Sequence, residues 1–464
     1  MWGEQMAQIV RVHRRSAGAP VGVASAWARA GRAPLVAAAV LALALLYSFP
    51  WLRIPDVLGV PLPFQRLIAW CGLAALGVRV ALQGRFRANA AARLYLGVAA
   101  LFFIVLGFST WVNMTRSEVF HTLRYASEMS KYVAVFGTGF LVYYALEHGL
   151  VKVVWLERLL LVSGALSIAF AYLFLFLYWA GFRSTNEILT NSFGGALGVW
   201  PTASFLPRLA GTTAEPQQLS VIFNTALMLM LSRTYVRRWW PVALAGLLVL
   251  VLSQSKFALI SLVAIALFVD ATYKRHRFVF AALVVLIIPP GLNLLSTLPV
   301  FRTTLNQGLE AQAFTDRLEN LGILAAIIRS NPLEGIGIGQ YGVYRGALLF
   351  NDPFDNPNYN AGNDLFTIFA EAGMFGFFLI ALLFGALFGK FVGVLPRLRG
   401  QQRESYLAVL IGAVTIFLNM LIGYAFLHAF FWVNLGMLLY LYRAWGWRPD
   451  PAPTSLSAPP RGHL

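Results

Sequence analysis

The sequence of 464 residues is strongly apolar, because 59% of its residues are hydrophobic and only 12% are charged. A soluble fold of this composition would have too little polar surface to cover its core, so an ordinary soluble enzyme is excluded. Stretches such as 34–51, 95–112 and 406–425 have few or no charges, and about 18 or more such residues can span a bilayer as a helix. The composition therefore predicts a polytopic membrane protein.

The formal net charge of +17 raises the question of nucleic-acid binding. The positions of the charges answer it, because Arg and Lys recur in alternate short loops, as the positive-inside rule expects of cytoplasmic loops. These basic loops lie within 85–93, 152–158, 233–238, 274–277, 390–403 and 443–448. Topology thus explains the excess charge, and no nucleic-acid partner is expected.

The single cysteine, Cys71, lies inside an apolar stretch. It allows neither a disulfide framework nor a cysteine-based metal site within one chain. At the N-terminus, Arg11, Arg14 and Arg15 precede a first apolar stretch that begins only near Ala33 and lacks a small-residue cleavage pattern after it. This arrangement predicts a retained first helix and not a cleaved signal peptide.

With the basic loops placed in the cytoplasm, the pattern predicts an all-α membrane domain over 33–448, with about twelve spanning helices and both termini inside. A cytoplasmic segment, 1–32, precedes this domain, and a tail rich in Pro and Ser, 449–464, is expected to be disordered. The helices are expected near 33–51, 67–84, 94–112, 130–147, 159–181, 217–233, 240–253, 257–273, 279–295, 364–389, 405–425 and 428–443.

Two connections on the outer side are much longer than the others, namely 182–217 and 296–363. Long ordered loops between packed elements are more often functional than not. Within the second, apolar residues recur at helical spacing over 315–328, which predicts a helix lying over the membrane face.

Four short patterns fall at or near the outer face: 208–216 (RLAGTTAEP), 253–256 (SQSK), 316–340 (DRLENLGILAAIIRSNPLEGIGIGQ) and 362–376 (GNDLFTIFAEAGMFG). Their order and spacing resemble the O-antigen ligase and polymerase superfamily, integral-membrane enzymes that take glycans from polyprenyl diphosphate. The residues that match are Arg208, Gly211, Glu215, Pro216, Ser255, Lys256, Arg317, the stretch 332–339, Gly373 and Gly376. The resemblance covers roughly the C-terminal half, and the first five helices agree only in hydropathy.

The resemblance implies a GT-C-like, all-α membrane fold with its site at the periplasmic face of the bacterial inner membrane. It implies a glycosyltransferase whose partners are a polyprenyl-diphosphate-linked oligosaccharide, the lipid bilayer and a chain-length regulator. Neither a metal nor another cofactor is expected, because two arginines can hold the leaving diphosphate.

Arg208 and Arg317 are the residues expected to bind that diphosphate, because a guanidinium group forms paired, charge-assisted hydrogen bonds to phosphoryl oxygens. The alternative is that both are interfacial arginines that reach toward phospholipid headgroups. Lys256 follows Ser255 at the outer end of a helix pair, where it would bind a phosphate or a sugar carboxylate, or snorkel in the same way. Gly337 and Gly339 would let backbone N–H groups approach the substrate, although a tight turn covering the helix bundle is the favoured alternative.

The general base is the point at which the sequence departs from the family. In the ligase branch a His-Asn pair begins the helix after the long loop, and the His is the expected base. Here the place reads Gly362-Asn363-Asp364, so Asp364 is predicted as the base, with Asn363 beside it at the substrate. Glu371 lies two helical turns further along the same face. Glu215, beside Pro216, is a further candidate.

His121 and His428 are additional candidates near the outer face, but a helix cap or a hydrogen-bonded surface residue is the simpler interpretation of each. Asp352 and Asp355 carry ligands that a divalent cation accepts. Their neighbours are Pro and Asn residues, which favour turns.

The leading functional hypothesis is a polymerase that moves a growing glycan onto the next lipid-linked repeat unit. The missing His and the stretch 335–341 (GIGIGQY), which is similar to polymerases of O-antigen and exopolysaccharide, favour it. An O-antigen ligase or a protein O-oligosaccharyltransferase would share the donor site and differ in acceptor. A transporter or lipid-linked glycan flippase is the alternative of another class. It is less favoured because the polar groups gather in outer loops and no internal repeat is found.

Overall fold

The computed structural model describes residues 53–446 except for gaps at 58–59, 84–87, 117–119, 181–197, 201–207, 213–215, 254, 274–310, 351–360, 422 and 424–425. The N-terminal half begins with a hairpin and continues with long helices: β1 (Arg53–Val57), β2 (Val60–Pro63), α3 (Phe64–Gln83), α4 (Ala90–Arg116), α5 (Thr122–Glu147) and α6 (Val153–Trp179). The C-terminal half comprises β3 (Gly198–Trp200), β4 (Arg208–Gly211), α8 (Pro216–Leu231), α9 (Val236–Leu252), α10 (Lys256–Tyr273), α13 (Ala311–Ser330), α14 (Tyr341–Phe350), α15 (Asp364–Val392), η1 (Leu395–Arg397), α16 (Gly400–Met420) and α17 (Ala429–Gly446).

The predicted all-α architecture is confirmed, whereas the twelve membrane spans and the GT-C-like arrangement stay predictions. Of the twelve expected helices, those near 33–51 and 279–295 lie outside the described residues, and each of the other ten coincides with an observed helix. Within the described residues, five helical segments are long and apolar enough to cross a membrane. The helix expected over 315–328 is present as α13. The sequence did not predict α14 or the hairpins β1–β2 and β3–β4.

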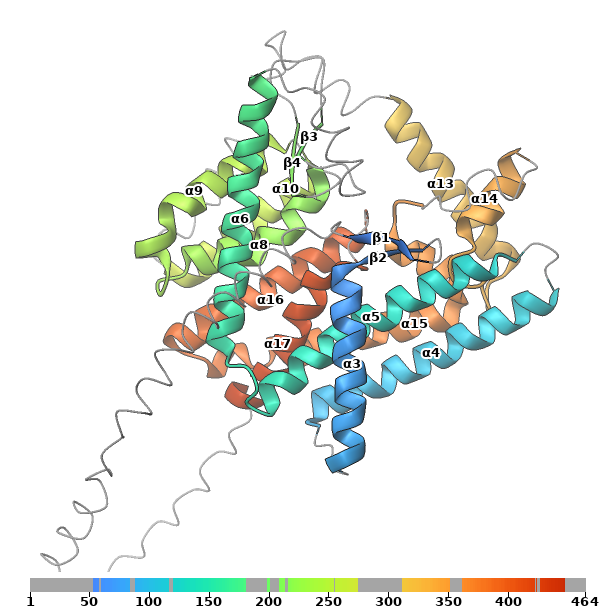
Figure 1. Ribbon diagram of the computed structural model, residues 1–464, viewed down its shortest axis with the longest axis horizontal. Helices are drawn as coiled ribbons and strands as arrows, with labels where there is room; N and C mark the ends of the chain where they lie inside the picture. The colour runs from blue at the N-terminus through green and yellow to red at the C-terminus, as the bar shows by residue number, and fades with distance from the viewer. Residues whose placement is uncertain are drawn as a thin grey trace, which may run out of the picture.

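Small residues let the helices approach closely, as is usual where lipid supplies no hydrophobic driving force between helices. The helices α5 and α17 pack so tightly that a Cβ atom on Gly436 would lie 2.4 Å from the carbonyl oxygen of Gly139. A Cβ on Gly137 would similarly meet the side chain of Leu73 where α3 crosses α5 (Figure 1). On the other side of the molecule, α8 packs against α6, α9, α10 and α16.

The core between α5, α15 and α17 is aromatic. The rings of Phe136 and Trp432 lie 4.3 Å apart between centroids, and Phe426 and Phe384 pack around them. Two polar groups of this core are paired: the indole N–H of Trp432 donates to the carbonyl of Phe426 at 2.7 Å, and the Tyr95 hydroxyl donates to the carbonyl of Phe136 at 2.6 Å. Such pairing is required in a bilayer, where no water replaces a lost partner.

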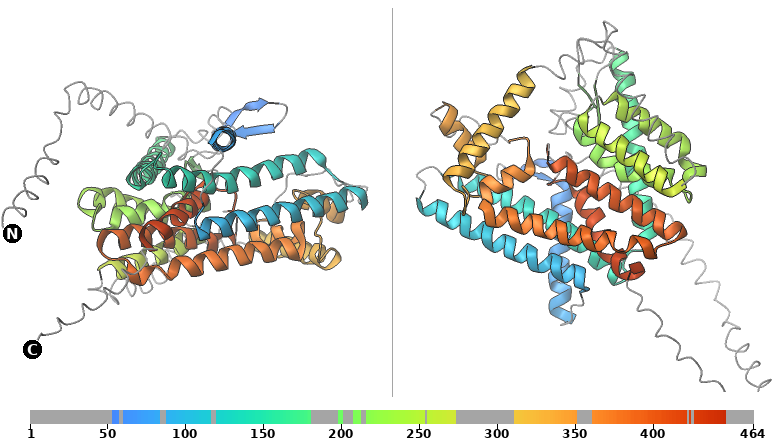
Figure 2. Two further views of the ribbon diagram at one scale, coloured as in Figure 1. Left: turned by 90° about the horizontal axis from the view of Figure 1, so that it is seen from below. Right: turned by 180° about the vertical axis from the view of Figure 1, so that it is seen from behind.

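The outward face of α4 is suited to lipid. Leu101, Ile104, Phe108 and Trp111 recur at helical spacing and are each more than half exposed. The opposite face of α4 packs on α15, and the two helices run alongside α5 (Figure 2). The ends of α4, α5 and α15 thereby come together, and the glycines of 335–339 and Gly373 lie between them.

Candidate functional site

A break in α15 creates the centre of the candidate site. Gly373 adopts φ 69° and ψ −174°, a backbone region that is essentially restricted to glycine, and the helix resumes after it. The N–H of Met374 then donates to the carbonyl of Pro332 at 2.9 Å. A Cβ atom on Gly373 would lie only 2.0 Å from the carbonyl oxygen of Leu333. Gly373, one of the glycines that match the family, thus marks a kink against which another loop packs.

That loop is the Gly-Ile-Gly-Ile-Gly stretch 335–339, called here the glycine loop. All three glycines have positive φ, between 71° and 89°, and both isoleucines are fully buried. The N–H groups of Ile336 and Gly337 donate to the carbonyls of Ala370 and Glu371 at 3.0 and 2.9 Å. Because the Met374 N–H is directed to Pro332, the Ala370 carbonyl lacks its usual helical donor, and the loop supplies one.

Glu371 is the anchor of the loop. Its buried carboxylate accepts the N–H of Tyr341 at 3.1 Å and the N–H of Gly339, and its carbonyl also accepts the Ser109 hydroxyl at 3.0 Å. Sequence reasoning treated Glu371 only as a secondary candidate for the base. The signal that would have raised it is a lone carboxylate two residues before the kink glycine.

The N–H groups of Gly337 and Gly339 therefore bond to Glu371 in this structure. The tight turn over the helix bundle, which was the alternative interpretation of these glycines, describes their geometry. Their predicted contact with substrate stays a prediction, and in this arrangement it would involve groups other than these two N–H donors.

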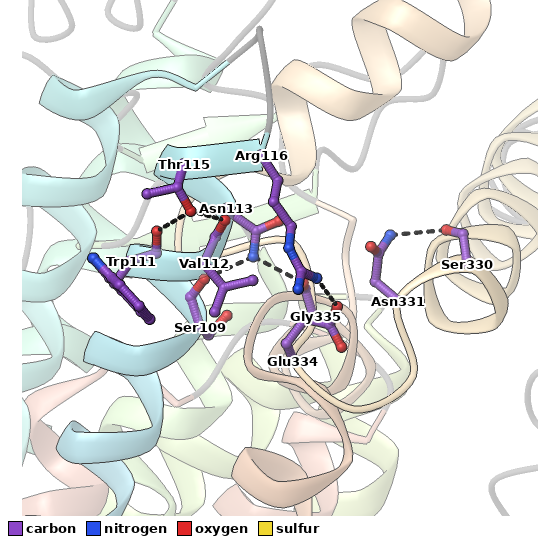
Figure 3. A network of polar contacts seen from close by, with 10 residues as sticks. All are labelled: Ser109, Trp111, Val112, Asn113, Thr115, Arg116, Ser330, Asn331, Glu334 and Gly335. Carbon is purple, nitrogen blue, oxygen red and sulfur yellow. Dashed lines mark hydrogen bonds and ion pairs between the residues drawn. The ribbon is translucent and has the colours of Figure 1, made fainter.

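The end of α4 closes the glycine loop from one side, as Figure 3 shows. The Asn113 amide donates to the carbonyl of Gly335 at 3.0 Å and also to the Ser109 carbonyl of its own helix at 2.7 Å. Arg116 forms an exposed ion pair with Glu334, with 3.3 Å between Nη1 and Oε1. Asn113 is buried, so its two hydrogen bonds contribute more to the position of the loop than the solvated ion pair does.

The start of α5 closes the loop from the other side. The side chain of Gln340 accepts the His121 N–H at 2.9 Å and donates to the His121 carbonyl at 3.2 Å. The His121 imidazole accepts the N–H of Arg124 at 3.1 Å and so caps α5. Beside it, a Cβ on Gly339 would lie 2.8 Å from the Cγ atom of Glu128, which explains the need for glycine there.

Asn363 and Asp364 lie where they were expected, at the start of α15. Asn363 is the helix cap, because its Oδ1 accepts the Phe366 N–H at 3.0 Å. Asp364, the predicted base, accepts the Phe426 N–H at 2.7 Å through Oδ2, and its own N–H donates to the carbonyl of Gly423 at 3.2 Å. Asn363 thus caps α15, and Asp364 holds the loop between α16 and α17.

The basic residues predicted at the donor are described through their backbone alone. Arg208 begins β4 and pairs with Trp200 of β3, Lys256 begins α10, and Arg317 lies in α13. Glu215 lies outside the described residues, as do Asp352 and Asp355. The second half of α13 is fixed to the site by a buried cluster in which its Ile323, Leu324 and Ile327 pack with Ile336 and Ala370.

Buried carboxylates gather here without forming a metal site. Tyr132 of α5 is buried and interacts electrostatically with Glu128, Asp364 and Glu371. Among the residues that the structure describes, no group of three or more Asp, Glu, His or Cys side chains is arranged to hold a metal ion. The arrangement instead provides carboxylates, a phenol and cations at one end of the helices, which suits proton transfer and the binding of an anionic, hydroxylated substrate.

The comparison with protein families identifies one segment. Residues 241–381 match the model of the O-antigen ligase family, and this segment contains α10, α13, the glycine loop, Glu371 and the kink. The chain therefore carries an O-antigen ligase domain. No curated protein matches the chain.

The matched domain supports a relationship to the O-antigen ligase and polymerase superfamily, whose members are glycosyltransferase-like enzymes, and the apolar helices indicate a multi-pass membrane protein. Its central motif is completed by residues outside the matched segment. These residues come from the N-terminal half, where the sequence resembles the family only in hydropathy. They are Ser109 and Asn113 of α4, and His121, which bonds to Gln340.

Proposed function

We propose that the protein is an inner-membrane polysaccharide polymerase that joins polyprenyl-diphosphate-linked repeat units at the periplasmic face. The observation that carries the proposal is the O-antigen ligase domain, whose glycine loop and kinked helix meet the polar ends of α4 and α5. Polymerase is preferred to ligase because Gly362 stands where the ligase branch has its His.

In this proposal Arg208 and Arg317 bind the donor diphosphate, with Lys256 as a further cation. The acceptor hydroxyl oxygen forms a bond to the anomeric carbon of the donor sugar. The bond from that carbon to the phosphate oxygen breaks, and its electron pair leaves with the polyprenyl diphosphate. Preorganised positive charge stabilises this developing anion.

Asp364 takes the proton of the acceptor hydroxyl in the proposed reaction. It is half-buried at the start of α15, and its hydrogen bond from Phe426 fixes the carboxylate in place. Electrostatic interaction of Tyr132 with Asp364 and Glu371 places further ionisable groups in its surroundings. Asn363 lies beside it to contact the sugar, and Glu215 is the second candidate for proton transfer.

A ligase or a protein O-oligosaccharyltransferase is the second candidate, since the matched family is named for O-antigen ligase. The two functions separate in a reconstituted assay. Purified protein in liposomes receives lipid-linked repeat units extracted from the cells that produce it, first alone and then with lipid A core or an acceptor protein. A polymerase makes a ladder of glycans from repeat units alone, whereas a product that appears only with an added acceptor would replace the proposal.

A further inference from the structure

Three basic side chains gather in the N-terminal half, outside the O-antigen ligase domain. Arg66 lies in the first turn of α3, and Arg124 and Lys131 lie in the first half of α5. We call these three residues the outer cation cluster. All three interact with Glu128, which is almost fully buried: Arg124 and Lys131 contact it, and Arg66 is attracted to it electrostatically. The indole N–H of Trp70, one turn further along α3, donates to the Ser130 hydroxyl at 3.3 Å and holds the two helices together.

Arg124 and Lys131 share the carboxylate of Glu128. Arg124 Nη2 lies 3.0 Å from Oε1 of Glu128, and the ammonium group of Lys131 forms an ion pair with the same oxygen. Arg66 is attracted electrostatically by Glu128 and repelled by Arg124. Lys131 is likewise repelled by Arg66 and Arg124. The three cations thus lie close enough together to disfavour one another's charge.

Charge balance distinguishes a binding site from a structural ion pair. Three cations face two carboxylates, because Arg124 and Lys131 both contact Glu128 and Arg124 is also attracted electrostatically by Glu371. Glu128 is the only carboxylate that acts on Arg66 and Lys131 among the described residues. Uncompensated charge in a half-buried position is costly, and a bound anion with several oxygens would remove that cost. The Lys131 side chain keeps 19% of its surface exposed, so an anion can reach it.

The cluster adjoins the candidate site. Gly339 packs against Glu128 and against the backbone of Arg124, and its N–H bonds to Glu371. Tyr132, next to Lys131 in the chain, interacts electrostatically with the predicted base Asp364. The arginines of the proposed donor site lie on other elements, β4 and α13.

We propose that Arg66 and Lys131, together with Arg124, bind a phosphate group of the acceptor lipid, which in a polymerase is a second polyprenyl-diphosphate-linked repeat unit. This inference rests on the proposed function, because a polymerase must hold two lipid diphosphates at once. The shared chemistry is an anionic phosphate at the membrane surface, which a phospholipid headgroup also offers.

Native mass spectrometry of the full-length protein in nanodiscs of neutral phosphatidylcholine tests the proposal by counting bound undecaprenyl diphosphate. The wild-type protein should bind two molecules. The double variant Arg66→Gln, Lys131→Gln should weaken one of them by roughly ten- to a hundred-fold, the effect expected when charge-assisted hydrogen bonds are lost. The matched control Arg79→Gln changes a basic residue further along α3, where it lies over the ring of Tyr144, and should bind two.

A second variant separates anion binding from a structural role. Glu128→Gln removes the carboxylate that competes for the cations, so the anion site predicts tighter binding of undecaprenyl diphosphate. A purely structural ion pair predicts a lower unfolding temperature with no gain in binding. The proposal is overturned by that second result, by two full-strength sites in the double variant, or by equal competition from phosphatidylglycerol, which would assign the cluster to a headgroup.

An error in the donor site can be distinguished from an error in the outer cation cluster. Arg317→Gln should remove the other bound diphosphate and leave the outer cation cluster occupied. If Arg317→Gln has no effect on either molecule while the double variant loses one, the proposed donor site is wrong and the cluster assignment holds. If the wild-type protein binds no diphosphate, both are wrong.

Discussion

At the scale of single residues, backbone conformation restricts which residue types can occupy the site more strictly than charge does. Gly335 and Gly373 face each other across the kink of α15, and a Cβ on Gly335 would lie 2.5 Å from the Gly373 nitrogen. Both have positive φ. The sequence predicted a turn at Gly337 and Gly339 and a helix over 364–389 that contains Gly373. It could not predict the contact of Gly335 with Gly373, because each residue's conformation depends on the other across about forty intervening positions.

Gly373→Ala should destabilise the protein strongly, because the added Cβ would overlap the Leu333 carbonyl at 2.0 Å. Backbone strain alone costs about 1–3 kcal/mol in this region of φ and ψ. Gly385→Ala is the matched control in the same helix, since nothing lies within 4 Å of its added Cβ. Thermal unfolding of both variants in detergent checks the prediction, which is wrong if they unfold at the same temperature.

Asp364→Asn should lower turnover more than it weakens donor binding. Asparagine can still accept the Phe426 N–H through its Oδ1, so the loop between α16 and α17 stays in place, but the amide cannot take the acceptor's proton. Polymer formation from purified lipid-linked repeat units across pH measures this effect. Wild-type turnover with an unchanged pH profile would move the base to another residue, and Glu215 or His428 would be tested next.

Arg208→Lys and Arg317→Lys should each reduce polymer formation while the protein still accumulates in the membrane. Lysine keeps the charge but loses the paired hydrogen bonds of the guanidinium group. Losing one such pair costs roughly 1.5–3 kcal/mol, or about ten- to a hundred-fold in activity. Arg329→Lys, at an exposed position near the end of α13, serves as the control. Normal polymer from the first two variants would refute the donor assignment.

At the scale of elements, the polar end of α5 explains the main boundary error. The sequence predicted this helix from residue 130, whereas it begins at Thr122. Charged residues such as Arg124 and Glu128 lower the hydropathy of this part of the chain, so it resembles a loop. It folds as helix because these charges pair with each other and His121 caps the first turn. Hydropathy detects burial in lipid and misses such helical extensions.

Gln340 connects the glycine loop to α5, and its removal should loosen both. Gln340→Ala leaves the N–H and the carbonyl of His121 without their side-chain partner, which costs about 1–3 kcal/mol for a buried group. Faster hydrogen exchange at the His121 amide, relative to the amides in the middle of α17, is the expected result. Asn331→Ala, at the end of α13, should leave this exchange unchanged. Equal protection in Gln340→Ala and wild type would show that the bridge contributes nothing.

At the scale of the whole molecule, the sequence predicted the helices better than the site. The alternation of apolar stretches and basic loops was sufficient to predict ten of the described helices, because hydrophobic length alone specifies them. The site depends on contacts between distant segments, such as Glu371 with Tyr341 and Asn113 with Gly335. A family resemblance located the glycine loop and the start of α15, but it did not extend to the α4 and α5 residues that hold them.

Polymerisation itself is tested most directly by comparing the number of polyprenyl diphosphate molecules released with the number of glycosidic linkages formed. Purified protein in liposomes receives only lipid-linked repeat units, and released polyprenyl diphosphate is quantified beside the glycosidic bonds in the glycan ladder. We expect one polyprenyl diphosphate to be released for each linkage formed, and both quantities to fall together in Arg317→Lys. Transfer of lipid-linked glycan across the bilayer without any release of polyprenyl diphosphate would contradict this expectation and favour a flippase.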